Sequence, residues 1–589
     1  MIQACTNSVK RMLNDLRLSA ILWLEGNLMN RILEAAVLLL LLAATVPGSC
    51  TTSKAKPAVG VYYFPGWYRA AQNPAGESSE WRSAIMKAAT PRATCGFYND
   101  SDPRLWAYYI PWMSSHGIDF IAFDWYYNAG QEFLYESLDR GFLQAEKNRD
   151  VKFCVHWCNH GGPWWIKPLD QSKPAVLAMT DLLCARYFHR PNYLRINNRP
   201  VFMIYETNTL LSFGGEDAVR DTLAAMRKRA KEKGFPDLYL VAVYPSASPA
   251  YLAKLKKLGF DAFCAYTYCW MRPPSVTWDT PAIPYPDLAD MMADYFYPNM
   301  ERISKKAGIP YWPTTFSGWD DRPRAGLEKA FINTDDSPEA FERMFRGALK
   351  HVNPASPVVL VEAWNEWGEG ACIEPSKQHG FGFLKAIADS LGKRSPFEGL
   401  PSAEEIASWS VLTPDELKVA AENESKPWPS KEPKKYPFGK SFDAPEVKMP
   451  YVFDFAKEGI PTDDIGLDNI AIEERTSEGT WFKTTGGDPK IVVSKVHIPM
   501  QQIKRITLEG KLIGGDGEIE IYWATARMPE FIGFASVLMT WSSSGSASID
   551  VSDILSWTNT GTPFTGLRLD PAGVAGVRFQ LRRIVLAGD

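Results

Sequence analysis

Short, almost continuously apolar runs alternate with longer amphipathic stretches between residues 57 and 392. Eight of these runs are rich in β-branched or aromatic residues, which is typical of strands that are buried on both faces. They cover residues 59–64, 119–126, 151–157, 199–205, 238–244, 260–267, 310–316 and 358–364. Amphipathic helical stretches separate them, such as 216–234 and 337–350. Eight strand–helix units predict an α/β fold, a (β/α)8 TIM-like barrel over residues 57–392.

A doubly wound open sheet is the alternative fold for this alternation of strands and helices. "FPGWY" (64–68), which follows the first predicted strand, does not match a glycine-rich dinucleotide fingerprint. The barrel is therefore the favoured fold.

The pattern changes after residue 392. Residues 393–450 predict a connector that is first helical and then rich in proline and lysine. From residue 451 to residue 589 short strand patterns are separated by turns that contain Gly, Asp and Pro. This spacing predicts an all-β sandwich of about the jelly-roll type.

The N-terminal segment 1–50 has the pattern of an export signal. Arg31 precedes an apolar stretch over 35–46, which is too short to span a bilayer comfortably. Small residues and Cys50 follow, as at a bacterial lipoprotein cleavage site; ordinary signal-peptidase cleavage nearby is the alternative. Residues 1–28 are unusual ahead of a signal, and Met29 would make a more normal start. We expect an exported protein, periplasmic, at the cell surface or an outer-membrane lipoprotein, with contact to a membrane only through a lipid on Cys50.

Charge and cysteine content indicate which classes of binding partner and cofactor to expect. The net charge is −4 with both signs dispersed, so we expect no nucleic-acid partner. The nine cysteines lack paired spacing, which argues against a disulfide framework. Cys154, His156, Cys158 and His160 alternate, which suggests a zinc site, but neighbours two apart on one strand rarely converge on an ion. We therefore predict no metal and no cofactor.

The carboxyl ends of barrel strands build the active site in this fold. Here nearly every such end carries an aromatic residue and a polar group that can form hydrogen bonds, a combination suited to a polyol ligand. Rings that simply plug the top of the barrel are the alternative. The candidate ligand-binding residues are Tyr63, Trp67, Asp124, Tyr126, Asn128, Trp157, Asn159, Tyr205, Tyr266, Trp319 and Asp320.

The stretch "VEAWNEWGEGACIEP" (361–375) follows the eighth predicted strand and contains the clearest candidate chemistry. Glu366 and Glu369 are three residues apart, which places them on the same side of a helical turn, and Gly368 and Gly370 permit such a turn. Nearby indoles and a second carboxylate would raise the pKa of a proton donor. Further candidate ligand-binding residues in this stretch are Trp364, Asn365, Trp367 and Glu374.

Several motifs together resemble one known family. "VGVYYFPGW", "SSHGIDFIAFDWYYN", "HWCNH", "GFDAF", "FSGWDDRPR" and "AWNEWGEGACIEP" are similar, in this order, to the glycoside hydrolase family 99-like group. This group includes the WbsX-like proteins and is related to endo-α-mannosidases. The resemblance implies a (β/α)8 barrel and action on glycosidic bonds, with an endo-acting enzyme suspected. For Glu366 and Glu369 it implies catalysis through a 1,2-anhydro sugar, with Glu366 as the base and Glu369 as the acid.

Three functions follow from this resemblance as hypotheses. The first is an exported glycoside hydrolase that acts on an oligo- or polysaccharide. The alternatives are a glycosyltransferase of polysaccharide biosynthesis and a non-catalytic glycan-binding lipoprotein that keeps only the ligand cleft. For Glu366 and Glu369 themselves, a salt-bridged loop is the alternative to a catalytic role. In "GWDDRPR", an internal Asp–Arg pair that orders the loop is the preferred interpretation of Arg324. The sandwich is either a carbohydrate-binding module, with Trp523, Trp541 or Trp557 as platforms, or a packing partner of the barrel.

Overall fold

The computed structural model describes most of the chain between residues 56 and 588. The described residues are 56–68, 81–82, 92–128, 130–159, 169–211, 214–243, 249–271, 273, 282–326, 330–424, 426, 446–456, 465–486, 489–514, 517–525, 536–541, 545–552, 554, 557, 563–571 and 575–588. The predicted export segment and Cys50 lie outside them, as does most of the Pro- and Lys-rich part of the predicted connector.

Eight parallel strands form the first sheet, and each overlaps one of the eight predicted runs. They are β1 (Ala58–Tyr63), β2 (Phe120–Asn128), β4 (Lys152–Trp157), β6 (Arg199–Ile204), β7 (Tyr239–Val243), β8 (Ala262–Cys264), β10 (Thr314–Phe316) and β12 (Val358–Glu362). Their order in the sheet is β10-β12-β1-β2-β4-β6-β7-β8. Two short strands, β3 (Gln131–Phe133) and β5 (Arg195–Ile196), pair antiparallel with β2 and β6.

Backbone hydrogen bonds connect the two ends of this strand order. The Phe263 N–H in β8 donates to the Pro310 carbonyl at 2.9 Å, and the Trp312 N–H donates to the Phe263 carbonyl at 2.9 Å. Because Pro310 and Trp312 lead directly into β10, these bonds close the sheet on itself. The predicted TIM-like barrel is confirmed.

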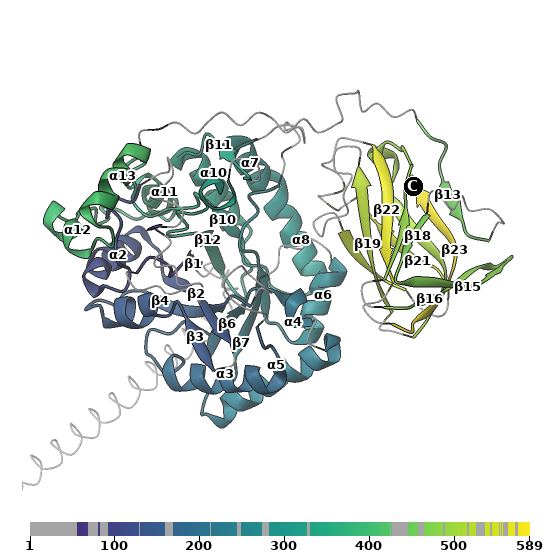
Figure 1. Ribbon diagram of the computed structural model, residues 1–589, viewed down its shortest axis with the longest axis horizontal. Helices are drawn as coiled ribbons and strands as arrows, with labels where there is room; N and C mark the ends of the chain where they lie inside the picture. Colours follow the sequence, from purple (N-terminus) through teal and green to yellow (C-terminus); the bar gives the residue numbers. More distant parts are fainter. Residues whose placement is uncertain are drawn as a thin grey trace, which may run out of the picture. The chain divides into compact units, whose positions relative to one another are not determined.

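Helices lie outside the ring of strands (Figure 1). The α-helices are α2 (Pro103–His116), α3 (Lys173–Arg186), α4 (Thr207–Leu211), α5 (Gly215–Glu232), α6 (Pro249–Leu258), α7 (Tyr285–Met291), α8 (Tyr297–Ala307), α9 (Arg322–Ala325), α10 (Pro338–Lys350), α11 (Gly382–Ser390), α12 (Ala403–Trp409) and α13 (Pro414–Glu424). At the start of α10 the Ser337 hydroxyl accepts a hydrogen bond from the Ala340 N–H at 3.2 Å. This contact satisfies one of the free N–H groups of the first turn, which is the role of a serine at the N-cap of a helix.

The C-terminal part is a sandwich of two antiparallel sheets. Its strands are β13 (Tyr451–Asp454), β14 (Ile465–Asp468), β15 (Ile470–Thr476), β16 (Gly479–Thr484), β17 (Lys490–Val493), β18 (Arg505–Ile513), β19 (Glu518–Thr525), β20 (Ser536–Thr540), β21 (Ala547–Asp550), β22 (Phe564–Asp570) and β23 (Arg578–Ala587). One sheet has the order β15-β16-β23-β18-β21, with β13 beside β23, and the other has the order β14-β17-β22-β19-β20. Buried side chains of both sheets form one apolar core, such as Leu508 in β18 and Ile521 in β19. The predicted sandwich is confirmed.

Trp523, Trp541 and Trp557 belong to the core of the sandwich. Each is at most 1% exposed, and the rings of Trp523 and Trp557 are 5.0 Å apart. Indole N–H groups donate to backbone carbonyls, from Trp541 to Gly545 at 3.0 Å and from Trp557 to Ile503 at 3.3 Å. The interpretation of these three residues as sugar platforms is wrong, because a ring face without solvent contact cannot stack on a sugar.

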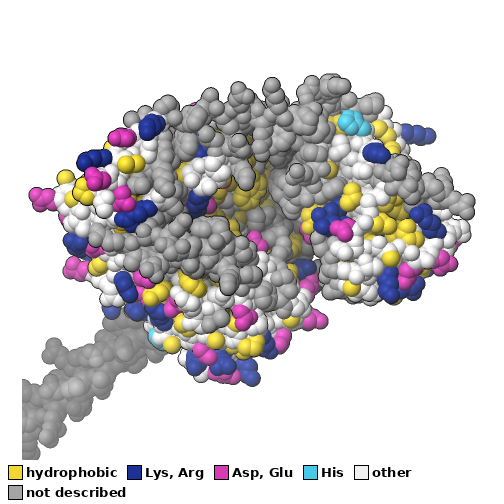
Figure 2. Space-filling model, in the orientation of Figure 1, with side chains coloured by type: hydrophobic (Ala, Val, Ile, Leu, Met, Phe, Trp, Pro, Cys, Tyr) yellow, Lys and Arg dark blue, Asp and Glu magenta, His cyan; other side chains and the backbone are white. Residues whose placement is uncertain are grey.

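The visible surface carries charges of both signs. Figure 2 shows Lys and Arg side chains interspersed with Asp and Glu over the face in view, in keeping with the net charge of −4. Within the described part of the chain, no helix combines the length and the apolar character needed to cross a bilayer.

Candidate active site

Glu366 and Glu369 lie on a tight turn directly after β12. The Glu369 N–H donates to the Glu366 carbonyl at 3.0 Å, and Glu366 and Ala371 exchange two backbone hydrogen bonds at 3.2 Å each. Gly370 completes the turn with a φ of +68°, in the left-handed region that favours glycine. The structure therefore places the two acids on a turn, as their spacing predicts.

Arg324 in α9 contacts both acids. Its Nη1 lies 2.8 Å from Glu369 Oε1, and its Nη2 lies 3.1 Å from Glu366 Oε2. Gly368 lies against the guanidinium, since a Cβ at this position would come within 2.5 Å of Arg324 Nε. The two carboxyl groups thus meet on one guanidinium, which a side chain at position 368 would displace.

The predicted Asp–Arg pairing for Arg324 is wrong. Asp320 pairs instead with Arg322, whose Nε lies 2.7 Å from Asp320 Oδ1. The loop does contain an Asp–Arg contact, but it is formed by Arg322 and not by Arg324. The guanidinium of Arg324 contacts Glu366 and Glu369 on the turn after β12 instead.

The two acids have different surroundings. The side chain of Glu366 is 4% exposed and accepts a hydrogen bond from the Tyr266 hydroxyl at 3.1 Å, in addition to the Arg324 contact. Both contacts stabilise its ionised form. The side chain of Glu369 is 19% exposed, and burial raises its pKa although Arg324 acts in the opposite direction. Burial thus favours a proton on Glu369, whereas the charge of Arg324 favours the ionised form of both acids.

A third acid, Glu362, lies beside this pair at the end of β12. It is fully buried, and neither carboxyl oxygen has a hydrogen-bond partner among the described residues. Burial raises its pKa well above the usual range, and the charges of Glu369 and Glu366 raise it further, while the Thr267 hydroxyl opposes the shift. Burial thus favours the protonated form of this carboxyl group.

Aromatic side chains line the barrel interior beside the acids. The Tyr266 ring lies 5.7 Å from the ring of Tyr205 and 6.2 Å from that of His156. Burial raises the pKa of Tyr266, and the charges of Glu366 and Asp124 add to the shift. Tyr126 is also buried, and the same two charges raise its pKa. The candidate residues Asp124, Tyr126, Tyr205 and Tyr266 are thus brought together with Glu366 and Glu369.

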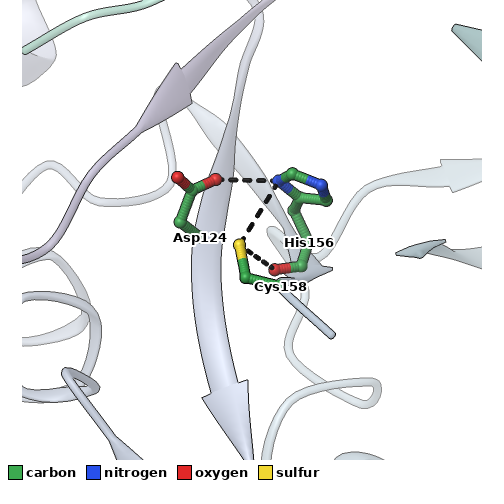
Figure 3. A group of neighbouring side chains, drawn as sticks. All are labelled: Asp124, His156 and Cys158. Atoms are coloured by element: carbon green, nitrogen blue, oxygen red, sulfur yellow. Dashed lines mark hydrogen bonds and ion pairs between the residues drawn. The ribbon is translucent and has the colours of Figure 1, made fainter. Parts of the chain in front are cut away.

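Asp124 also belongs to a group of metal-ligand side chains (Figure 3). Asp124 Oδ1 lies 2.8 Å from His156 Nδ1, and Cys158 Sγ lies 4.0 Å from the same nitrogen. The three donor atoms are all within 4.8 Å of one another. The sequence predicts no metal because residues two apart on one strand rarely converge on an ion. In the structure His156 and Cys158 come from the end of β4, and Asp124 comes from the neighbouring strand β2.

Two predicted ligand residues form hydrogen bonds that tie strand ends together. Asn365 accepts from the Phe64 N–H and donates to the Phe64 carbonyl, both at 2.9 Å, which links the ends of β12 and β1. Asn159 makes the same pair of contacts with Glu206 at 2.6 and 2.9 Å, which links the ends of β4 and β6. Their contact with a sugar stays a prediction.

Glu374 and Trp367 lie in a buried hydrogen-bond network. Glu374 accepts from the hydroxyls of Tyr98 at 2.8 Å and Tyr109 at 2.5 Å, and from Trp367 Nε1 at 3.0 Å. The carboxyl group is 1% exposed, and burial raises its pKa to about 8. The geometry gives Glu374 a structural role, and its contact with a sugar stays a prediction.

The remaining candidates pack around the barrel mouth. Trp67, Trp157 and Trp364 are each at most 1% exposed, and their indole N–H groups have no partner among the described residues. Tyr63 and Asn128 form hydrogen bonds, from the Tyr63 hydroxyl to Asp100 and from the Asp170 N–H to Asn128 Oδ1. Trp319 is partly buried against the core. Contacts of these six residues with a ligand also stay predictions.

Arg324 and Glu362 join the site although the sequence assigns neither of them a catalytic role. Arg324 lies 45 residues from Glu369, and its neighbours Asp320 and Asp321 offer nearer acidic partners in the sequence. The sequence around Glu362 could have identified it as a site residue. An acid within an apolar strand that ends at the barrel mouth is costly to bury unless it has a role in the site.

The chain matches a known family and known relatives. A family model described as Glycosyltransferase WbsX matches residues 86–387, just over half of the chain. Two relatives named uncharacterized protein WxcX, from two strains of Xanthomonas campestris pv. campestris, are 26% identical over 358 residues, covering 56% of this chain and 49% of each relative. The chain thus spans about half the length of the curated relatives it matches.

Two kinds of solved structure show a distant likeness to the chain. A GH99 endo-alpha-mannosidase from Bacteroides thetaiotaomicron is 18% identical, with a TM-score of 0.39, over 57% of this chain and 96% of that chain. A family 29 carbohydrate-binding module is 13% identical, with a TM-score of 0.18, over 23% of this chain and 86% of that chain. The family model confirms the resemblance that the motifs indicate: the chain belongs to the family described as Glycosyltransferase WbsX.

Proposed function

We propose that the chain is a glycoside hydrolase that cleaves a complex glycan with the carboxyl groups of Glu366 and Glu369. One observation carries this proposal: the two carboxyl groups meet on Arg324 at the barrel mouth, where burial raises the pKa of Glu369. Cleavage of a glycosidic bond uses such a pair, with one group protonating the leaving oxygen and the other acting as a base or nucleophile.

The pair supports a mechanism through a 1,2-anhydro sugar, as the family resemblance implies. Glu366 takes the proton of the sugar 2-hydroxyl, whose oxygen attacks the anomeric carbon while Glu369 protonates the leaving oxygen. Glu369, now ionised, then removes a proton from water, which opens the epoxide at the anomeric carbon, and Glu366 returns its proton to the 2-oxygen. The two displacements retain the configuration of the anomeric carbon.

Arg324 acts on both acids in this scheme. Its charge favours the ionised form of Glu366, which it contacts, and limits how far burial raises the pKa of Glu369. A bound sugar exchanges one of these contacts for a hydrogen bond from its own hydroxyl group. Because burial favours the protonated form of Glu362, this third acid adds less negative charge beside the reacting pair.

The proposal also covers the kind of substrate and the location of the enzyme. An endo-acting enzyme on an extended glycan follows from the family resemblance and from the aromatic residues at the strand ends. Export and a lipid on Cys50 rest on the N-terminal sequence pattern. In cells grown with a labelled fatty acid, we expect the label on the wild-type protein but not on the Cys50→Ser protein.

The family description favours a second candidate, a glycosyltransferase. In that reaction Arg324 would also face the phosphate of a sugar nucleotide, because guanidinium groups suit phosphate. The two reactions differ in the acceptor, which is water for a hydrolase. Incubation with glycans in ¹⁸O-labelled water therefore separates them, because a hydrolase places the label on the released reducing end without any sugar nucleotide.

A panel of defined α-linked oligosaccharides tests the proposal. We expect cleavage by the wild type, and a fall of about 1,000-fold in turnover for both Glu366→Gln and Glu369→Gln. NMR of the first-formed product should show the retained anomer, and 2-deoxy analogues should resist cleavage.

Glu339→Gln, at an exposed acid in the first turn of α10, is the matched control and should keep full turnover. Equal turnover in the wild type, Glu366→Gln and Glu369→Gln would exclude the assigned catalytic pair.

A further inference from the structure

Asp124, His156 and Cys158 form a compact donor cluster at the carboxyl ends of β2 and β4 (Figure 3). Asp124 pairs with His156 in the parallel ladder, and Cys158 follows His156 by two residues, which places its side chain on the same side. In Figure 3 the three side chains point toward one another. A hydrogen bond between Tyr126 and Cys158 brings a phenol oxygen to the same cluster as a fourth donor.

The cluster is almost completely shielded from solvent. His156 is 0%, Asp124 4% and Cys158 4% exposed. Burial raises the pKa of both Asp124 and Cys158, because neither negative charge is well solvated there. A bound dication would balance one carboxylate and one thiolate, and this balance removes the cost of ionising both groups.

We propose that this cluster binds a divalent ion of the zinc class through the Asp124 carboxylate, His156 Nδ1 and the Cys158 thiolate. Sulfur and imidazole ligands suit zinc and its neighbours, whereas magnesium and calcium prefer oxygen alone. Three protein ligands leave a fourth position for the Tyr126 hydroxyl or a water molecule.

Small movements bring two of the three donor separations to tetrahedral values, and the third is at most 4.8 Å. Zinc-to-ligand lengths imply a sulfur–nitrogen separation of about 3.5 Å and an oxygen–nitrogen separation of about 3.3 Å in a tetrahedral site. The observed separations are 4.0 Å and 2.8 Å, so each changes by only about half an ångström. The ion displaces the proton between Asp124 and His156 Nδ1, which moves to Nε2, and the thiol proton of Cys158 leaves for solvent.

The proposed metal ligands lie near the acid pair but do not include it. None of these ligands is Glu366, Glu369 or Arg324, so metal binding is measured without any glycan. A Glu366→Gln variant should bind the ion as the wild type does. Failure of the proposed hydrolysis would therefore leave the metal site standing, and the reverse also holds.

Titration of the full, chelator-treated chain with Co²⁺ tests the proposal. We expect one equivalent to bind, with the charge-transfer absorption that marks a thiolate–cobalt bond. Cys158→Ser should lose this absorption and weaken binding by more than about 100-fold, and His156→Gln should weaken it similarly. A folded wild type that shows no thiolate–cobalt absorption would overturn the proposal and leave a hydrogen-bonded Asp–His pair beside a thiol.

Cys154→Ser is the matched control, because this buried thiol lies two residues before His156 and contacts Met203 Sδ at 3.8 Å. It should keep both the absorption and the affinity. Thermal unfolding with added Zn²⁺ gives a second measurement, in which the midpoint rises for the wild type and Cys154→Ser but not for Cys158→Ser. Absorption that persists in Cys158→Ser would contradict the assignment of the ligand.

Discussion

Glu374 shows how a buried acid can serve the fold. Three donors converge on its carboxyl group, the hydroxyls of Tyr98 and Tyr109 and the indole N–H of Trp367. We expect Glu374→Ala to lower the free energy of unfolding by about 3–5 kcal/mol, because three buried donors lose their acceptor. Glu374→Gln keeps one acceptor oxygen and should cost about 1–2 kcal/mol.

Chemical denaturation, followed by the helical circular dichroism of the barrel, measures both variants. Equal stability of Glu374→Ala and the wild type would show that the network contributes nothing.

Glu362 makes the stability of the barrel depend on pH. Its pKa in the folded protein is raised well above the usual 4.5, so the folded chain holds this proton more tightly than the unfolded chain. The free energy of unfolding therefore falls as pH rises above 4.5 toward the folded pKa. We expect Glu362→Gln to match the wild type near pH 4 and to exceed it by about 1–3 kcal/mol at pH 8.

Denaturation at a series of pH values measures this difference. Glu339→Gln, which alters an exposed acid, should keep the pH dependence of the wild type. A Glu362→Gln variant that loses stability with pH as steeply as the wild type would refute the assignment of the proton to Glu362.

At the scale of elements, two asparagines tie neighbouring strand ends together. Asn365 binds the backbone of Phe64, and Asn159 binds that of Glu206, each through one donated and one accepted hydrogen bond. We expect either change to Ala to cost about 2–4 kcal/mol, because each leaves a buried N–H and a buried carbonyl unpaired. Only Asn365→Ala should also lower glycan turnover, by roughly tenfold, because residue 366 follows it directly.

Denaturation and turnover are measured on the same preparations. Equal losses of turnover in both variants would show that Asn365 acts on the fold alone.

The strands were predictable from sequence because burial on both faces leaves a continuous apolar run. The run 260–267 is longer than β8 (Ala262–Cys264), since apolar character continues beyond the hydrogen-bonded ladder into the barrel mouth. The turn that carries Glu366 and Glu369 was predictable from local spacing and two glycines. These features depend on neighbours in the chain.

Contacts between distant segments were not predictable in this way. Arg324 selects partners on another loop, and Asp124 joins His156 from the neighbouring strand, which only the register of the sheet determines. The burial of the three tryptophans of the sandwich core was not predictable either, because the residue type does not reveal which face of a strand is covered.

At the scale of the whole molecule, the sandwich has a core of its own. Residues 446–588 contribute buried side chains from both sheets, including Trp523, Trp541 and Trp557. We expect residues 446–589 to fold when produced alone, because this core is formed entirely within the segment. Its tryptophan emission should be blue-shifted and should change in one cooperative unfolding transition. A segment that shows no such transition would contradict an independent sandwich.

The isolated sandwich also tests whether this part of the chain binds glycans. Trp481 in β16 is the partly exposed tryptophan among its described residues, and the guanidinium of Arg578 lies 5.2 Å from its ring. If the sandwich is a carbohydrate-binding module, Trp481→Ala should weaken retention on polysaccharide gels by at least about tenfold without altering the fold, because stacking on a sugar needs an open ring face. Trp541→Ala, in contrast, should lower stability by about 3–5 kcal/mol through the cavity it leaves. Retention of the folded wild-type segment on no polysaccharide would leave the sandwich as a packing partner of the barrel, and unchanged retention of Trp481→Ala would place the binding face on other residues.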